Sequence, residues 1–273
     1  MLQIGVVFQT RVDWVMTAEA TPAKGLRPIG LLASLLYFGI PCGVFSASIL
    51  GLLPWMIQHG YSQIVTFFVT FGAPLAAMLI AALVCYRLEG HPWTWPAFRD
   101  RMRLRMPTSR IWLWTIALVL VGLFGGPVIR PVARLFADIH FYTPPPEFIT
   151  VMSGLRDGTF GGMHMHGRWD VFLLMAFALI ILNIGGEELW WRAIILPRQE
   201  LAFGKWAWLV NGVLWDLFHF FYHSNGASVV SYLLPTVPLA FVAQRTRNTW
   251  PGIIAHIIAN SAALTVLWGT VTG

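Results

Sequence analysis

The chain has 273 residues, of which 57% are hydrophobic and only 11% are charged, and its net charge is +6. Soluble domains carry about 25% charged residues, so this composition excludes an ordinary water-soluble protein and favours a chain that is solvated by the lipid bilayer. The positive charge does not predict nucleic-acid binding, because the basic residues lie between apolar runs, where the positive-inside rule accounts for them.

The N-terminal residues 1–28 mix polar and apolar side chains and do not resemble a secretory signal. We expect them to form a short cytoplasmic lead. The two cysteines, Cys42 and Cys85, lie inside apolar runs, where a free thiol behaves as a small hydrophobic group. Neither a disulfide nor a cysteine metal site is therefore expected.

Seven apolar runs follow along the chain, and a helix needs about 20 such residues to cross a bilayer core. We predict an all-α fold, namely a polytopic transmembrane helical bundle with about seven spans and up to eight helices. The fifth and sixth runs are short, which suits helices buried among others. The runs cover residues 29–53, 62–86, 111–131, 171–196, 207–222, 228–243 and 251–269.

The charges between the runs predict the orientation. The loop 87–110 contains six arginines, and we place it in the cytoplasm. Seven further basic residues then fall on the same side: Arg11, Lys24, Arg27, Arg198, Lys205, Arg245 and Arg247. Only four fall on the other side: Arg130, Arg134, Arg156 and Arg168. This bias predicts a protein of the cell membrane with a cytoplasmic N-terminus, a long outer loop over 132–170 and a C-terminus outside.

The segment GGEELWWR places three charged residues inside the fourth run, where each costs roughly 2.5–3.5 kcal/mol at the bilayer centre. Glu188 and Arg192 are four residues apart, so on a helix they share one face and can pair. Glu187 is turned about 100° away and lacks that partner, which makes it a candidate base. One buried structural ion cluster would explain the three residues equally well.

The segment WDLFHFFYH carries His219 inside the fifth run. A lone membrane histidine is more often a packing or hydrogen-bonding residue than a catalytic one. Asp216, three residues earlier, either orients His219 or pairs elsewhere. His223 falls at the expected outer turn, where solvent exposure is a sufficient explanation.

The segment AHIIAN carries His256 and Asn260 four residues apart, so both point the same way. Both can donate hydrogen bonds to an oxygen that gains negative charge in a transition state. The alternative is an interhelical hydrogen-bonded pair, worth about 0.6 kcal/mol.

Taken together, three helices contribute a surplus carboxylate, a histidine and a donor pair. A carboxylate and an imidazole can jointly remove a proton from water. We therefore expect Glu187, His219, His256 and Asn260 to converge on one cavity. Counting residues from the helix ends gives depths of about 16, 20 and 8 Å for Glu187, His219 and His256, a spread that helix tilt would have to close.

These motifs resemble the family of CAAX prenyl proteases and bacteriocin-processing enzymes, metal-independent glutamate proteases similar to the Ras-converting CAAX endopeptidase. The family's EExxxR, aromatic-xxx-H and HxxxN stand here as EELWWR (187–192), WDLFH (215–219) and HIIAN (256–260). The second motif usually begins with Phe, and Trp215 is a conservative departure.

The resemblance covers residues 171–269, which we predict to be the catalytic core, while 29–170 would form an N-terminal transmembrane envelope. It implies that Glu187 and His219 activate water, that His256 and Asn260 form an oxyanion hole, and that Glu188 and Arg192 are a supporting pair. It also implies no metal or other cofactor, and a membrane-anchored or lipidated peptide or protein as substrate.

Two other functions compete with this one. A zinc-dependent membrane metalloprotease could bind metal through His219, His256 and a glutamate, although the chain has no H-E-x-x-H. A non-catalytic membrane scaffold or immunity protein, or a transporter that relays protons, would also use buried acids and histidines. Against a transporter, the sequence shows no paired repeat.

Overall fold

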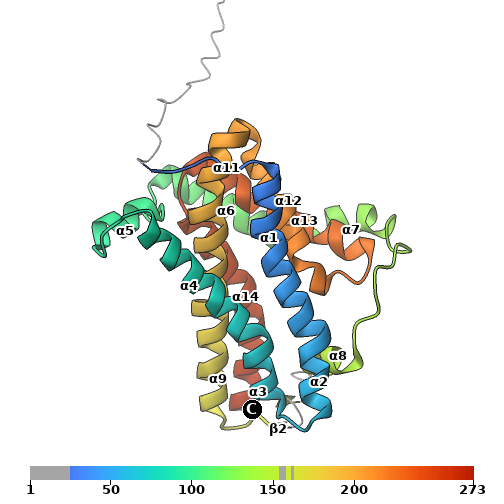
Figure 1. Cartoon of the computed structure of the whole chain (residues 1–273). Coiled ribbons are helices and arrows are strands. Elements are labelled where there is room, and N and C mark those ends of the chain that lie inside the picture. The colour runs from blue at the N-terminus through green and yellow to red at the C-terminus, as the bar shows by residue number, and fades with distance from the viewer. Residues whose placement is uncertain (1–24, 154–157, 161–162) are drawn as a thin grey trace, which may run out of the picture.

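The computed structural model describes residues 25–153, 158–160 and 163–273, so most of the expected N-terminal lead lies outside the described residues. The described chain is a helical bundle with one very small sheet, which confirms the all-α prediction (Figure 1). Each of the seven apolar runs forms a helical segment. Among the described residues, five stretches are long and apolar enough to cross a membrane, or six if one bent pair counts as a span.

The first two segments form an antiparallel pair that lines one side of the bundle. The first comprises α1 (Leu31–Ser46), the π-helical η1 (Ala47–Leu52) and α2 (Leu53–Gln58). A turn with Gly60 in a left-handed conformation (φ 81°) leads to the second segment. That segment comprises α3 (Gln63–Phe67), the π-helical η2 (Phe68–Gly72) and α4 (Ala73–Leu88).

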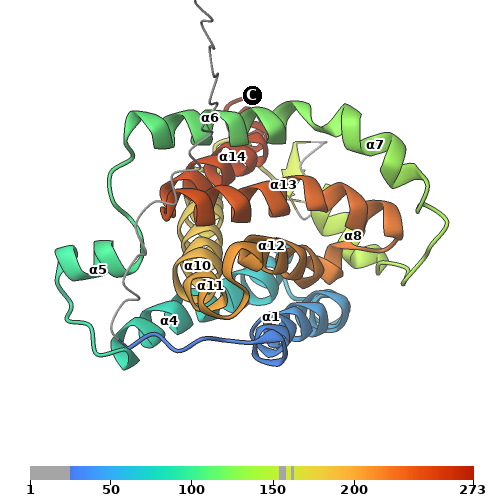
Figure 2. The ribbon, with the colours of Figure 1, turned by 90° about the horizontal axis from the view of Figure 1, so that it is seen from above.

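The next segment crosses the bundle rather than following its long axis. After α5 (Trp95–Arg101), helices α6 (Ser109–Phe124) and α7 (Gly126–Arg134) meet at a bend of 49°. Figure 2 shows α6, α7 and α13 lengthwise in the view in which α1 and α11 are seen end-on. Gly125 at the bend lies so close to α13 that an added Cβ would sit 2.8 Å from the Leu234 side chain.

The described part of the predicted outer loop contains regular structure. It contains α8 (Pro146–Ser153) and a hairpin of β1 (Thr159–Phe160) and β2 (Met163–His164), in which Thr159 is opposite His164. Figure 1 shows α8, β2 and the C-terminus at one end of the bundle, and α5 and α11 toward the other.

The fourth segment carries the glutamates through the middle of the bundle. It comprises α9 (Trp169–Ala176), α10 (Gly185–Glu187) and α11 (Leu196–Phe203), joined by the π-helical η3 (Phe177–Ile184) and η4 (Glu188–Ile195). An added Cβ at Gly186 would lie 2.8 Å from the Leu75 carbonyl oxygen of α4. The glycine before the two glutamates therefore permits close contact between α10 and α4, which buries Glu187 and Glu188.

The last three segments close the bundle around the fourth. The chain reverses at η5 (Gly204–Trp206) into α12 (Ala207–Phe218) and η6 (His219–Tyr222), followed by α13 (Gly226–Thr246) and α14 (Trp250–Thr272). Asn211 of α12 donates a hydrogen bond to Gln199 of α11 across the reversal (2.8 Å), so the 54-residue stretch 169–222 contains two segments.

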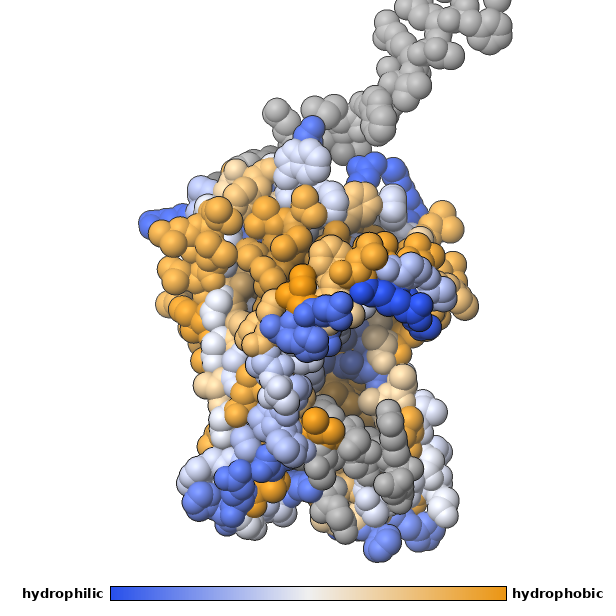
Figure 3. All heavy atoms as spheres, turned by 90° about the vertical axis from the view of Figure 1, so that its right-hand side faces the viewer, coloured by the Kyte–Doolittle hydropathy of each residue, from blue (hydrophilic) through white to orange (hydrophobic). Residues whose placement is uncertain are grey.

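One hydrophobic core joins residues from Ile29 to Val271, so the expected envelope and the expected catalytic core are packed together. The division at residue 170 stays a prediction. Figure 3 shows the face on which α7 lies, with an apolar upper half, a hydrophilic strip at the level of α7 and a hydrophilic lower end. Arg130 and Arg134 of α7 are exposed. Broad apolar surface of this kind is what a lipid-facing protein presents.

Candidate active site

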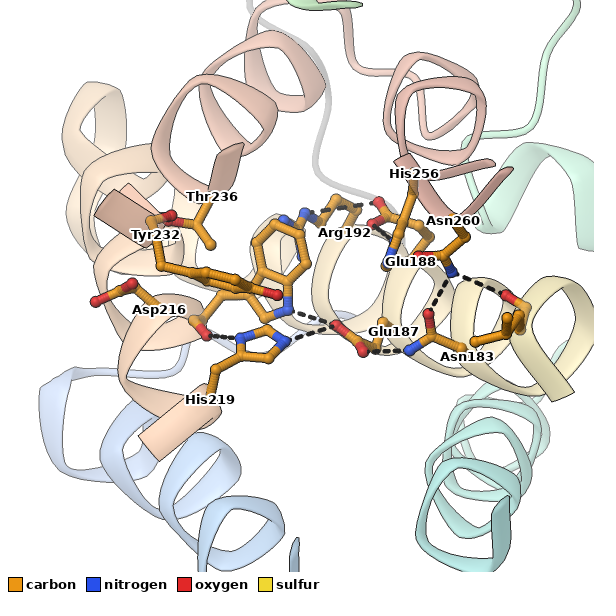
Figure 4. A network of polar contacts seen from close by, with 12 residues as sticks. Asn183, Glu187, Glu188, Arg192, Asp216, His219, Tyr232, Thr236, His256 and Asn260 are labelled. Atoms are coloured by element: carbon orange, nitrogen blue, oxygen red, sulfur yellow. Dashed lines mark hydrogen bonds and ion pairs between the residues drawn. The ribbon is translucent and has the colours of Figure 1, made fainter. Parts of the chain in front are cut away.

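Four predicted site residues meet in one cavity at the centre of the bundle. Glu187 comes from α10, His219 from the first position of η6, and His256 and Asn260 from α14 (Figure 4). All four line a cavity of about 280 Å³. The expected convergence is thus present in the structure, whereas their catalytic roles stay predictions.

Glu187 is buried, with 3% of its surface exposed, and both of its carboxylate oxygens accept hydrogen bonds. The indole Nε1 of Trp215 donates to Oε2 at 2.6 Å, and Nδ2 of Asn183 donates to Oε1 at 2.6 Å. It forms no ion pair with an arginine in the described chain. Two neutral donors therefore hold this carboxylate and leave its charge without an arginine partner.

His219 faces Glu187 across a short gap. Its Nδ1 lies 2.8 Å from the carbonyl oxygen of Trp215, so this nitrogen is the one that carries the proton in the neutral ring. Its Nε2 lies 3.8 Å from Glu187 Oε2, which is longer than a direct hydrogen bond. The lone pair of Nε2 and the carboxylate oxygen are both acceptors, so a water molecule on the cavity side of the pair can donate one hydrogen bond to each.

The sequence predicted that Glu188 pairs with Arg192, and the structure shows a second contact of Glu188. The expected pair is present but loose, with 3.7 Å between Arg192 Nε and Glu188 Oε2. The other oxygen of Glu188 lies 3.2 Å from His256 Nδ1. Glu188 therefore orients His256 and leaves the ring's Nε2 edge for the cavity, which His256 lines. An added Cβ at Gly252 would collide with Glu188, so this glycine permits α14 to approach.

Asn183 is a further site residue, which the three motifs do not include. Besides donating to Glu187, it accepts a hydrogen bond from Asn260 Nδ2 at 2.7 Å. The same amide group of Asn260 also reaches the Leu179 carbonyl oxygen at 3.1 Å. Asn183 therefore links the proposed base to the proposed oxyanion donor. Its spacing of four residues before Glu187 is the signal that could have identified it.

Asp216 and His223 form a separate buried pair. His223 is only 1% exposed, so the expectation of a solvent-exposed histidine is wrong. The chain folds back at η6 and brings His223 Nε2 to 3.0 Å from the Asp216 carbonyl oxygen and 3.4 Å from its carboxylate. Of the two possibilities left open for Asp216, the structure shows the pairing elsewhere and not the orientation of His219.

A second cavity of about 340 Å³ reaches the site from the side of α6 and α13. It shares His219, Tyr232, His256 and Asn260 with the first cavity. Glu187 lines only the first, and Trp215 lines only the second. The four shared side chains therefore border both cavities.

The metal alternative finds little geometric support. Across residues 25–153, 158–160 and 163–273, no three side chains of histidine, cysteine, aspartate or glutamate are grouped as a metal site requires. His219 and His256 each face a different glutamate. The hairpin His164 and the nearby His166 are not part of such a group either.

The fold and the site together define an integral membrane protein that carries buried acid, histidine and amide groups around an internal cavity. Residues 158–262 match the family model of type II CAAX prenyl endopeptidase Rce1-like proteins. This segment contains all three motifs, so the resemblance predicted from them is confirmed, and the family supports a protease function. No curated protein and no solved structure matches the chain.

Proposed function

We propose that the protein is an intramembrane endopeptidase that hydrolyses a peptide bond by direct attack of water. The observation that supports this most strongly is the 3.8 Å gap between Glu187 Oε2 and His219 Nε2 beside a cavity. A water molecule in the cavity beside this pair could donate one hydrogen bond to each acceptor. Proton removal by a positioned side chain typically accelerates a reaction about 10²–10⁴-fold.

In this mechanism the water oxygen attacks the scissile carbonyl carbon while its proton passes to Glu187 or His219. The carbonyl oxygen then carries negative charge and lies against His256 and Asn260. Donors that are fixed before the reaction stabilise such an oxyanion without reorganising. Collapse of the tetrahedral intermediate breaks the C–N bond, and the proton taken from water passes to the leaving amine.

The two proposed donors differ in whether a protein oxygen already occupies the group that would bind the oxyanion. His256 is held at Nδ1 by Glu188, so its Nε2–H can face substrate when the ring is protonated. Both partners of the Asn260 amide nitrogen are protein oxygens, Leu179 O and Asn183 Oδ1. Asn260 would therefore exchange one of these hydrogen bonds for the substrate oxyanion.

We further propose that the substrate is a membrane-anchored or lipidated peptide or protein, and that the end bearing α5 and α11 is cytoplasmic. The arginine excess at this end supports the orientation. Accessibility of Ser109→Cys to a membrane-impermeant thiol reagent only from outside the cell would contradict it.

A comparison of the membrane peptidomes of cells with the wild-type chain and with Glu187→Gln tests the function. We expect at least one membrane protein to accumulate uncleaved with Glu187→Gln, and its new terminus to be lost. Glu200→Gln is the matched control, since Glu200 pairs with Arg103 away from the cavity. Identical peptidomes for wild type and Glu187→Gln would contradict a protease function that depends on Glu187.

A further inference from the structure

The side chain of Trp215 occupies the centre of the site. At the sequence level, Trp215 is a conservative departure from the phenylalanine that usually begins the second motif. The structure shows a chemical difference, since the indole Nε1 donates a 2.6 Å hydrogen bond to Glu187 Oε2. A phenylalanine ring has no such donor.

The carboxylate oxygen that Trp215 holds is the one that faces His219. Glu187 Oε2 lies 3.8 Å from His219 Nε2, and Oε1 points toward Asn183 instead (Figure 4). Rotation of the carboxylate about its last bond would change the distance from Oε2 to His219. The indole hydrogen bond opposes that rotation. Because only 4% of the Trp215 surface is exposed, the surrounding side chains hold the indole in place.

Trp215 also contacts two other members of the site. Its carbonyl oxygen accepts from His219 Nδ1, which sets the tautomer and the ring orientation of His219. Its indole ring lies under the Arg192 guanidinium, with 3.6 Å between the guanidinium carbon and the ring centroid. None of the three nitrogens of Arg192 has a hydrogen-bond partner within the described part of the chain. The indole face is therefore a main support of this cation.

We propose that Trp215 is a positioning residue whose indole N–H fixes the Oε2 atom of Glu187 opposite Nε2 of His219. This inference rests on the proposed peptidase function. It predicts that the ring and the N–H have separable roles. The ring packs against Arg192, and the N–H sets the geometry of the atom that receives the water proton.

The first test is Trp215→Phe in purified protein, with kcat and KM measured on a reporter peptide that the wild type cleaves. We expect kcat to fall roughly 10- to 100-fold, as for the loss of one hydrogen bond to a charged group, while KM changes less than about twofold. The matched control is Trp191→Phe. Trp191 is fully buried next to Arg192, but its Nε1 has no hydrogen-bond partner within the described residues. Its kcat per folded molecule should stay within about twofold of wild type.

A second variant removes the N–H without changing the ring shape. Incorporation of 3-benzothienylalanine at position 215 replaces the indole NH by sulfur, and it should reproduce the loss in kcat with unchanged thermal stability. Coupling to Asn183 gives a further check. If both donors fix one carboxylate, Trp215→Phe combined with Asn183→Leu should lose less activity than the product of the single losses.

The possible outcomes separate this inference from the proposed function. If the wild type cleaves the reporter and both position-215 variants keep wild-type kcat, the positioning role is wrong while the peptidase function stands. A rise in KM without a fall in kcat would also overturn it, since that pattern assigns Trp215 to substrate binding. If the wild type and all variants are equally inactive on every candidate peptide, the proposed function fails and takes this inference with it.

Discussion

Two clusters of glutamate and arginine differ in how completely their polar groups are paired. The loop clamp (Glu89, Arg101 and Arg198) ties α5 to the fourth segment. All three nitrogens of Arg101 donate, to Glu89 or to the Ala193 carbonyl oxygen, and Nη2 of Arg198 donates to Glu89 as well. Among the described residues, Nε of Arg198 is left without a partner in this cluster. The six-arginine loop is thus partly a structural element, and not only a signal for membrane orientation.

The site cluster (Glu187, Glu188, Arg192, His219 and His256) shows the opposite pattern. Arg192 has no hydrogen-bond partner among the described residues, and neither does Glu188 Oε2. Leaving a buried polar group unpaired costs about 1–3 kcal/mol, and more for a charged group. A fold keeps such groups where a ligand or a reaction uses them. The difference supports our proposal that the site cluster acts on a substrate, whereas the loop clamp stabilises the fold.

The largest effect is expected for His219→Gln, which tests whether a residue of the site cluster affects turnover without affecting stability. Glutamine can fill the space but cannot accept a proton at neutral pH. We expect turnover of a reporter peptide to fall about 10²–10⁴-fold, the usual contribution of a general base. Thermal unfolding in detergent should change little. Turnover above a tenth of the wild-type value would show that His219 is not part of the reacting pair.

Glu188→Gln should affect both stability and activity, because Glu188 faces Arg192 and His256. Removal of one partner from a buried ion pair costs about 3–5 kcal/mol, so we expect low yield and early unfolding. Glu188→Gln combined with Arg192→Met removes the unpaired charge and should recover part of the stability but little activity. If Glu188→Gln is stable and inactive while Glu187→Gln cleaves normally, the base is Glu188, and our assignment to Glu187 is wrong.

Arg101→Met tests the loop clamp with a smaller expected effect. Arg198 still pairs with Glu89, so we expect a loss of about 1.5–3 kcal/mol in the free energy of unfolding, as for hydrogen bonds to a charged group. Turnover per folded molecule should not change. Arg99→Met is the control, because the Arg99 side chain is 41% exposed and its 3.4 Å pair with Asp100 should contribute within about 0.5 kcal/mol. A selective loss of turnover in Arg101→Met would contradict a purely structural clamp.

The smallest effect concerns pH and the same clamp. Burial disfavours the charged form of Glu89, but the hydrogen bonds and charges of Arg101 and Arg198 outweigh it and lower the pKa below its ordinary value of 4.5. A lowered folded-state pKa gives stability that is present above pH 4.5 and is lost as the pH falls through the folded-state pKa. We expect Glu89→Gln to flatten the acid side of the unfolding-temperature profile. An unchanged profile would show that Glu89 does not contribute.

The helical segments and the pairing of Glu188 with Arg192 could be predicted from the sequence, because both depend on the pattern of residues along one helix. Hydropathy identified every run, and the i, i+4 rule placed Glu188 with Arg192. Contacts between helices were not accessible in this way. The hydrogen bond from Trp215 to Glu187 and the Asp216–His223 pair depend on how α12 lies against its neighbours.

The counted depths of the site residues failed for the same reason. Counting at a fixed rise per residue assumes helices that run along the membrane normal. Figure 2 shows α12 lengthwise in the view that shows α11 end-on, so residues along α12 gain little depth. The orientation of α12 therefore reduces the depth of His219, which the count had placed farthest from His256.

The most direct test of a structural and a reactive cluster makes the same glutamate-to-glutamine change in each. Glu187→Gln and Glu89→Gln would be purified side by side, and each preparation assayed for thermal unfolding and for reporter cleavage. We expect Glu187→Gln to lose cleavage by at least 100-fold and to keep its unfolding temperature. We expect Glu89→Gln to unfold at a lower temperature and to keep its cleavage rate per folded molecule. Wild-type cleavage by Glu187→Gln, or parallel losses of both properties in both variants, would contradict the division into a structural and a reactive cluster.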